Sequence, residues 1–384
     1  MTTHLTRDVF LGIAAIPFIY YAIAIFSSFR FFLAAGAKTD KMSGFMPPVS
    51  NLKPVRGLDP DAYENFASFC RQDYPNYEIL FCIGDTSDPA YPVLQRLVRD
   101  FPERQIRIVV GSGRIATNDK VAKLARLVEE ASHEHLVISD SDVRVEPDYL
   151  RKVIAPLEDP KVGATTCFYV PIEESTWVQR LQDIGMASDF YPGILVAKQL
   201  DGVKFALGPT IATTRTRLQA FGGYGAIENR PADDLLVGRL IAEQGYEVEL
   251  LPYTISTVAD YQSLSELFHK RLRWITVMRH MRPWGHFGLI FTLGLPWALV
   301  AIALLPTAGV TASYLGGYLI VRSLLTVMVD SWGLKQHGVW KKLAFVPVWD
   351  GMATVIWLTS FTRKSIRWRG RDYLMRDGEL VPLL

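Results

Sequence analysis

The chain has few cysteines. Cys70, Cys82 and Cys167 are the only ones in 384 residues, and they lie far apart. They do not have the paired spacing that zinc ligands or a disulfide framework require, so the sequence argues against both. This cysteine usage fits a reducing compartment.

The chain also lacks an excess of charge of either sign, an internal repeat and a low-complexity tract. Lys and Arg number 41 against 39 Asp and Glu, which gives a formal net charge of +2. With a total so near zero, any electrostatic function must depend on where the charges lie. We expect no nucleic-acid partner.

Apolar residues are abundant. They make up 49% of the sequence, and the mean hydropathy is +0.14. This composition is too apolar for an ordinary soluble domain and too charged for a pure membrane bundle. The sequence therefore predicts one soluble part and one membrane part.

Three apolar stretches are long enough to cross a bilayer of roughly 30 Å, at residues 9–35, 287–305 and 312–329. We interpret the first as an uncleaved anchor, because a cleaved signal peptide would have a shorter apolar core. Arg322 lies within the third stretch, so that helix should turn its charge toward protein or a polar cavity.

Basic residues predict the orientation, since Lys and Arg accumulate on the cytosolic side of membranes. A further apolar stretch at 343–362 contains Pro347, Asp350 and Gly351, which favours a re-entrant or interfacial passage over a fourth crossing. We expect three crossings, an external N-terminus and a cytosolic catalytic domain. This orientation depends on the basic residues next to the apolar stretches, which are Arg30, Lys38, Lys41, Lys335, Lys341, Lys342, Arg363, Lys364, Arg367, Arg369 and Arg371.

Between the apolar ends, short apolar runs alternate with amphipathic helical patterns. This order predicts an α/β fold with a parallel-rich sheet and right-handed crossovers, whose site lies at the carboxyl ends of the strands. The predicted strands are 49–55, 78–84, 106–110, 135–139 and 162–169, and the predicted helices are 62–71, 91–100, 120–132 and 148–155.

Acidic residues follow two of these strands. Asp140 and Asp142 come directly after the run HLVIS, and Asp85 follows the run ILFCIG. Carboxylates there are candidate ligands of a divalent cation, and the alternative for Asp140 and Asp142 is a loop cap. The triplet Asp59-Pro60-Asp61 has the same spacing yet precedes a helical pattern and needs no metal, so position after a buried strand is what favours Asp140.

Two later segments carry charge on helical patterns. Asp233 and Asp234 open one such pattern, where they either serve a site or favour the helix macrodipole. Residues 268–284 form a basic amphipathic pattern that suits an anionic membrane surface. Its cations could also stabilise negative charge on a departing diphosphate.

Together these residues carry a resemblance. Asp85, the Asp140-Ser141-Asp142 triplet, Asp234 and the Lys270-x-x-Arg273-Trp274 motif resemble, in order and spacing, the signature of processive and lipid-directed inverting glycosyltransferases. The runs LKPVRGLDP (52–60), DYPNYEILFCIGDTSDPA (73–90), SDSDVRV (139–145) and WRGRDY (368–373) resemble the ceramide glucosyltransferase family over nearly the whole chain.

The resemblance implies a GT-A fold, a UDP-sugar donor, Mg²⁺ or Mn²⁺, and a lipid acceptor. It implies that Asp85 contacts the uridine, that Asp140 and Asp142 bind metal and diphosphate, and that Asp234 is the general base. An aspartate can act as this base because a carboxylate is already ionised at neutral pH.

The same resemblance covers the remaining site residues. Asn118 and Lys120 resemble the family's donor-side Asn-x-Lys stretch, while Arg273 and Trp274 would lie against diphosphate and acceptor. Lys270 departs from the family's Gln or Arg. A lysine keeps the charge but lacks the planar fork of arginine that makes bidentate contacts.

We therefore expect a membrane-bound inverting enzyme that moves a hexose, most simply glucose, from UDP-glucose to ceramide. One alternative is a UDP-N-acetylglucosamine transferase acting on a hopanoid lipid, and another is a non-catalytic membrane sensor of nucleotide sugars. The predicted parts are an N-terminal anchor and linker (1–47), a catalytic domain (48–262), an interfacial helix (263–286) and a C-terminal membrane region with a basic tail (287–384).

Overall fold

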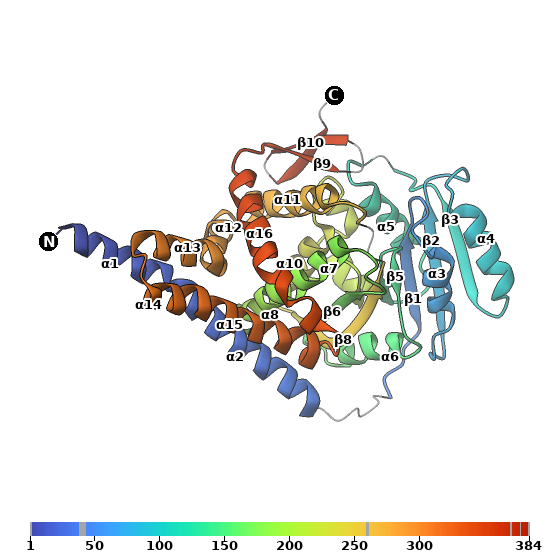
Figure 1. Cartoon of the computed structure of the whole chain (residues 1–384). Coiled ribbons are helices and arrows are strands. Elements are labelled where there is room, and N and C mark those ends of the chain that lie inside the picture. The colour runs from blue at the N-terminus through green and yellow to red at the C-terminus, as the bar shows by residue number, and fades with distance from the viewer. Residues whose placement is uncertain are drawn as a thin grey trace.

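The structure is a computed structural model that describes residues 2–37, 44–114, 116–258, 261–368, 371–376 and 378–382. Lys38, Lys41 and Arg369, whose charges entered the orientation prediction, lie outside these ranges. Figure 1 shows an α/β domain on one side and a group of helices on the other, which extends to the N-terminus.

A mixed sheet of eight strands forms the centre of the domain, in the order β3-β2-β1-β4-β7-β6-β8-β5. The first four strands are parallel, as predicted, but β7 runs antiparallel to β4 and β6, and β5 runs antiparallel to β8. The strands are β1 (Val49–Pro54), β2 (Tyr77–Ile83), β3 (Gln105–Val110), β4 (His135–Ile138), β5 (Val143–Arg144), β6 (Val162–Pro171), β7 (Ile211–Thr214) and β8 (Glu247–Thr257).

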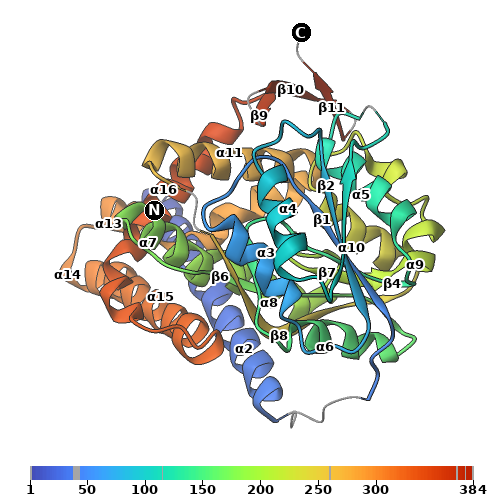
Figure 2. The ribbon, with the colours of Figure 1, turned by 90° about the vertical axis from the view of Figure 1, so that its right-hand side faces the viewer.

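Helices cover both faces of the sheet, because side chains along a strand point alternately to opposite faces. On β2, Phe81 packs with α3 (Ala62–Cys70), α4 (Tyr91–Asp100) and α6 (Tyr149–Ile154). Its neighbour Leu80 packs toward α5 and α10 on the other face. Figure 2 shows α3 and α4 in front of the sheet. The helices of the second face are α5 (Asp119–Glu130), α9 (Arg215–Ala220) and α10 (Asp233–Glu243).

A helical insertion between β6 and β7 connects the domain to the apolar helices. It consists of α7 (Trp177–Gly185), a π-helical turn (Met186–Phe190) and α8 (Tyr191–Asp201), and the sequence analysis did not predict it. Tyr191 of α8 and Tyr21 belong to one buried cluster that continues into the core behind the sheet. The apolar helices are therefore packed against the domain.

Three helices are long and apolar enough to span a membrane: Leu5–Gly36, Ala308–Gly333 and Leu343–Ser360. The first comprises α1 (Thr2–Ala14) and α2 (Ile16–Ala37), and the second includes α14 (Ala308–Val310) and α15 (Gly317–Val327). The predicted crossing at 287–305 falls on a bent pair of helices, since Pro283–Thr292 and Gly294–Leu304 meet at a bend of 59°. This bent pair contains α12 (Pro283–Gly288) and α13 (Gly294–Leu304).

Residues 343–362, which we expected to be re-entrant or interfacial, contain the helix α16 (Val346–Ser360). Pro347 lies in its first turn, where a missing N–H breaks no helical bond. Asp350 is fully buried, and the Nε of Arg322 donates to its Oδ2 at 3.0 Å. The prediction that Arg322 turns its charge toward protein is confirmed.

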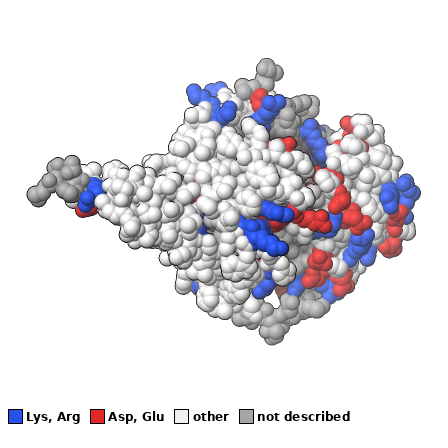
Figure 3. Space-filling model, in the orientation of Figure 1, with Lys and Arg blue, Asp and Glu red and all other residues white. Residues whose placement is uncertain are grey.

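Side chains with charge are unevenly distributed over the surface. In Figure 3 they gather over the sheet side of the molecule, whereas the face over α1, α13 and α16 is almost uncharged. Exposed apolar residues on these helices include Leu5, Leu299 and Leu358, which are 69%, 53% and 56% exposed. Such a surface is typical of contact with lipid or another apolar partner.

Two elements complete the fold: the helix before the bent pair, and a small sheet formed by the C-terminal strands. The helix α11 (Leu264–Met281) corresponds to the predicted basic helix and packs against α16. A separate antiparallel sheet at the C-terminus, near the top of Figure 1, has β10 between β11 and β9. Its strands are β9 (Ser365–Trp368), β10 (Arg371–Arg376) and β11 (Glu379–Pro382).

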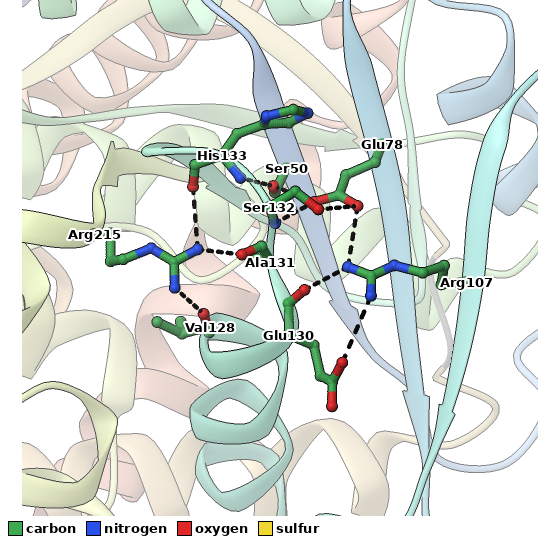
Figure 4. A network of polar contacts seen from close by, with 9 residues as sticks. All are labelled: Ser50, Glu78, Arg107, Val128, Glu130, Ala131, Ser132, His133 and Arg215. Atoms are coloured by element: carbon green, nitrogen blue, oxygen red, sulfur yellow. Dashed lines mark hydrogen bonds and ion pairs between the residues drawn. The ribbon is translucent and has the colours of Figure 1, made fainter.

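Arg215 binds the C-terminal end of α5 at the sheet edge opposite the predicted site (Figure 4). Its guanidinium donates to the carbonyls of Val128 at 2.7 Å and His133 at 3.3 Å, and also to that of Ala131. The last carbonyls of a helix have no partner within the helix. Arg215 therefore supplies partners at one end of α5, while the other end leads toward the predicted site.

We predict that Arg215→Ala lowers the thermal midpoint of the protein by several degrees. Losing these hydrogen bonds from a charged donor costs about 1–3 kcal/mol. Arg239→Ala is the matched control, because Arg239 forms an exposed ion pair with Glu243 and such pairs contribute little. Thermal unfolding of the purified protein in detergent measures both. Equal midpoints for the two variants would contradict the role assigned to Arg215.

Candidate active site

Two of the predicted aspartates meet at the carboxyl edge of the sheet. Asp140 follows β4, and Asp234 lies in the first turn of α10. A Cβ atom added at Gly208 would lie 3.3 Å from Asp140 Oδ2 and 3.1 Å from Asp234 Oδ2. Both carboxylates therefore approach the same backbone position, where glycine leaves them room.

Lys120 connects these carboxylates. Its Nζ lies 2.8 Å from Asp140 Oδ1 and 3.0 Å from Asp233 Oδ2. Burial opposes the lysine charge, but Asp140, Asp233 and Asp234 outweigh it and raise the pKa of Lys120 well above its usual value. Lys120 is therefore a fixed cation within a group of three aspartates.

Asn118 caps the helix that carries Lys120. Its side chain is fully buried, with Oδ1 accepting from the N–H of Val121 at 3.3 Å and Nδ2 donating to the carbonyl of Arg230 at 3.0 Å. These contacts connect the start of α5 with the loop that precedes Asp233. They give Asn118 a positioning role, and its direct contact with a donor stays a prediction.

Asp142 lies in a crowded acidic environment. Burial and the carboxylates of Asp140 and Asp59 raise the pKa of Asp142 to about 7, against the opposing charge of Lys270. The Oδ2 of Asp59 accepts a hydrogen bond from Ser141 at 2.6 Å. The sequence predicted Asp59 to be a residue before a helix with no need of a metal, whereas the structure connects it to the Asp140–Asp142 turn.

Asp85 lies at the same edge of the sheet but outside this acidic group. It follows β2, which is separated from β4 only by β1. Its side chain is exposed, and hydrogen bonds from Ser87, one of them from the N–H at 2.7 Å, lower its pKa. The structure leaves Asp85 accessible to a ligand that extends along the edge from Asp140.

Lys53 is a site residue that the sequence analysis missed. It is fully buried on β1, and its Nζ donates to the carbonyl of Asp140 at 2.9 Å and to Ser139 Oγ at 3.3 Å. The ammonium also lies 3.4 Å from the ring centroid of Phe69. Burial lowers the pKa of Lys53 to about 7, while Asp140 and Asp142 oppose that shift. A lysine inside a strand that is otherwise buried was the available signal.

The helix α11 brings the predicted cationic motif to the site. The charge of Lys270 stabilises ionised Asp142, and its Nζ lies 4.5 Å from the ring centroid of Tyr261 and 5.7 Å from that of Trp274. Arg273 follows one turn after Lys270 on the same helix. The motif thus lies where its cations and aromatic ring can face a ligand held by the aspartates.

Two further residues are Tyr169, which carries no sequence signal, and Arg271, which belongs to the predicted basic pattern at 268–284. Burial raises the pKa of the Tyr169 hydroxyl, which Asp234 and Asp142 raise further while Arg271 opposes them. Arg271 is buried, with its guanidinium 4.7 Å from the ring centroid of Trp274. The tyrosine hydroxyl thus lies near the aspartates, whereas the buried arginine packs against Trp274 of the cationic motif.

This arrangement suits an anionic ligand together with a hard cation. Burial and the neighbouring Asp233 raise the pKa of Asp234 to about 6, so the carboxylate is ionised at neutral pH and can accept a proton. Among the described residues, no three His, Cys, Asp or Glu side chains are close enough to hold a metal. Mg²⁺ often uses only one or two carboxylates and completes its coordination with water and substrate phosphates.

Comparison with solved structures identifies the fold. The chain is similar to a mannosyltransferase from Pyrobaculum calidifontis, solved in complex with GDP-Man and Mn²⁺, with a TM-score of 0.51 and 20% sequence identity. The similarity covers 90% of this chain and 99% of the other. The domain therefore has a GT-A glycosyltransferase fold, as the sequence predicted.

Curated relatives point in the same direction. Ceramide glucosyltransferase 3 of Caenorhabditis elegans is 23% identical over 363 residues, which is 89% of this chain and 76% of the relative. A ceramide glucosyltransferase of Gibberella zeae is 31% identical over 147 residues, or 36% of this chain and 28% of the relative. The model of glycosyl transferase family 21 matches residues 9–381. The chain belongs to this family and is a hexosyltransferase.

Proposed function

We propose that the protein transfers glucose from UDP-glucose to a hydroxyl of ceramide and inverts the anomeric carbon. The observation that carries the proposal is the meeting of Asp140 and Asp234 at Gly208, with Lys120 between Asp140 and Asp233. Relatives named ceramide glucosyltransferases support the lipid acceptor and the sugar. A hopanoid acceptor with a UDP-N-acetylglucosamine donor would use the same site.

The proposed metal is Mg²⁺ or Mn²⁺, held by Asp140 and Asp142. Crowding by Asp140 and Asp59 makes an ionised Asp142 unfavourable until a cation neutralises the turn, which fits a divalent site with oxygen ligands. When bound, such an ion offsets negative charge on the donor diphosphate. The Mn²⁺ present with the Pyrobaculum mannosyltransferase supports this class of ion.

The proposed mechanism follows from the charges of the chain. Asp234 accepts the proton of the attacking hydroxyl, while Lys270 and Arg273 stabilise the negative charge that grows on the leaving UDP. Attack on the face opposite the leaving group requires one displacement and inverts the anomeric centre. Trp274 offers an aromatic surface to the acceptor.

The donor extends in the other direction along the sheet edge. We assign the uridine to the side of Asp85, which lies two strands from Asp140. Lys120 is assigned to the donor side as well, and Asn118 holds its helix in place.

The apolar helices supply the proposed membrane anchorage and its topology. Before α16, Lys342 contacts Glu174 at 2.9 Å and also Asp183, and directly after it the carbonyl of Phe361 accepts from Arg279 of α11 at 2.8 Å. Both ends of α16 therefore lie on the side of the catalytic domain. We propose crossings by Leu5–Gly36, the bent pair and Ala308–Gly333, with 343–362 as a re-entrant or interfacial passage that begins and ends on the cytosolic side. The part boundaries are those predicted from the sequence.

We predict that Asp142→Asn raises the metal-free thermal midpoint at pH 8 by a few degrees. In the wild type the pKa of Asp142 is raised to about 7. The free energy of unfolding therefore falls as pH rises from the pKa of an unfolded aspartate through 7. Asparagine does not ionise, so the variant avoids this loss. Mn²⁺ with UDP should stabilise the wild type and not the variant. Asp201→Asn, at an exposed position, is the control. If Mn²⁺ with UDP stabilises Asp142→Asn as much as the wild type, Asp142 is not a metal ligand.

We predict that Asp234→Asn lowers lipid glycosylation by on the order of 10²–10⁴-fold with little change in UDP binding, because a general base acts on the transition state. The assay offers UDP-glucose, UDP-galactose and UDP-N-acetylglucosamine with ceramide and hopanoid acceptors, and mass spectrometry identifies the product. Glu243→Gln, exposed on the same helix, should keep full activity. If hopanoid is the only lipid glycosylated, ceramide is not the acceptor. If Asp234→Asn turns over as fast as the wild type, Asp234 is not the general base.

We predict opposite labelling at the two turns between membrane helices. The three native cysteines are buried, so a new exposed cysteine reports its own position. In intact cells, an impermeant maleimide should label Ala308→Cys, whereas His337→Cys should react only after permeabilisation. Labelling of His337→Cys in intact cells would contradict the proposed topology.

A further inference from the structure

The C-terminal sheet contacts the loop that leads into the paired aspartates, although the two are far apart in sequence. The N–H of Leu380 on β11 donates to the carbonyl of Asn229 at 2.8 Å. Leu380, Tyr373 and Val277 belong to one buried apolar cluster, and Ala232 packs against that cluster. Ala232 directly precedes Asp233.

The same loop is bound from its other side by the start of α5. The N–H of Thr117 donates to Asn229 Oδ1 at 3.2 Å, and Asn118 Nδ2 donates to the carbonyl of Arg230 at 3.0 Å. The N–H of Asn118 also donates to the carbonyl of Glu228 at 2.9 Å. The loop thus lies between the helix that carries Lys120 and the C-terminal sheet.

The backbone of this loop is strained at one residue. Ala232 has a φ of +55°, in the left-handed region that only glycine adopts without steric cost. A residue held in such a conformation persists when the surrounding structure determines it, and these residues cluster at functional sites. Ala232 is followed at once by α10, so its conformation sets the direction in which Asp233 and Asp234 enter the site.

We infer that the C-terminal sheet positions the general base. Leu380 and its cluster hold Ala232 in the left-handed conformation, which directs Asp233 to Lys120 and Asp234 to the acceptor side of Asp140. Leu380 and Ala232 are positioning residues, since neither is assigned a contact with substrate. The inference rests on the proposed function for Asp234, but the contacts that support it are independent of the identity of the lipid.

Two neighbours on β11 provide a matched pair of variants. Leu380 is 3% exposed within the cluster, whereas Val381 is 41% exposed on the other face of the strand. We expect Leu380→Ala to lower kcat for lipid glycosylation by about tenfold to a hundredfold, because small misplacements of a catalytic group are costly. The KM for UDP-glucose should change less than about twofold. Val381→Ala should behave as wild type.

A second substitution separates positioning from general loss of stability. Glycine adopts the left-handed conformation freely, so Ala232→Gly should reduce the dependence on Leu380. We expect the double variant Leu380→Ala, Ala232→Gly to recover most of the lost kcat. Without that recovery the loss in Leu380→Ala reflects damage elsewhere, and the inference is overturned.

Hydrogen exchange of the full-length protein in lipid nanodiscs tests the contact without any assay of activity. Amide exchange over residues 228–236 should accelerate in Leu380→Ala and stay at the wild-type rate in Val381→Ala. Equal exchange and equal kcat in the two variants would overturn the inference. If the wild type transfers no sugar, the proposed function fails, while accelerated exchange in Leu380→Ala alone still supports the structural brace.

Discussion

The balance of buried charge at the carboxyl edge of the sheet is the constraint on which the rest of the site depends. Burying ionised groups is costly unless they are paired. Lys120 pairs with Asp140 and Asp233, and Lys53 supports the turn that carries Asp140 and Asp142. Carboxylates still outnumber these lysines, so the protein holds an acidic excess that a divalent cation and a cationic helix can offset.

Much of this site could be predicted because it lies at the ends of strands. Asp140 and Asp85 follow buried apolar runs, and the pattern of those runs fixes the sheet edge to which they belong. The meeting of Asp140 with Asp234 could not be derived from spacing, because it depends on Gly208 and on an antiparallel strand without a clear pattern. Lys53 was missed although it lies within a predicted strand, because the pattern of that strand does not show what a buried lysine contacts.

The membrane part was predictable in length but not in shape. Apolar runs give the number of residues that can cross a bilayer, but they do not give the bend of 59° at Leu293. Beside that bend the N–H of Gly294 donates to the hydroxyl of Tyr21, a contact between residues far apart in sequence. Arg322 was correctly expected to face protein, yet its partner Asp350 lies in a segment that composition alone suggested would be interrupted. Whether a charged residue is buried in an apolar segment depends on its partner elsewhere in the chain. The periodicity of apolar residues does not identify that partner.

Anomalous diffraction from a complex with Mn²⁺ and UDP-glucose would locate the metal and the sugar in the site. We predict a manganese peak between the carboxylates of Asp140 and Asp142, with the diphosphate beside it and Asp234 facing the anomeric carbon from the side opposite UDP. A manganese peak away from Asp140 and Asp142, or a sugar turned away from Asp234, would contradict the proposed site.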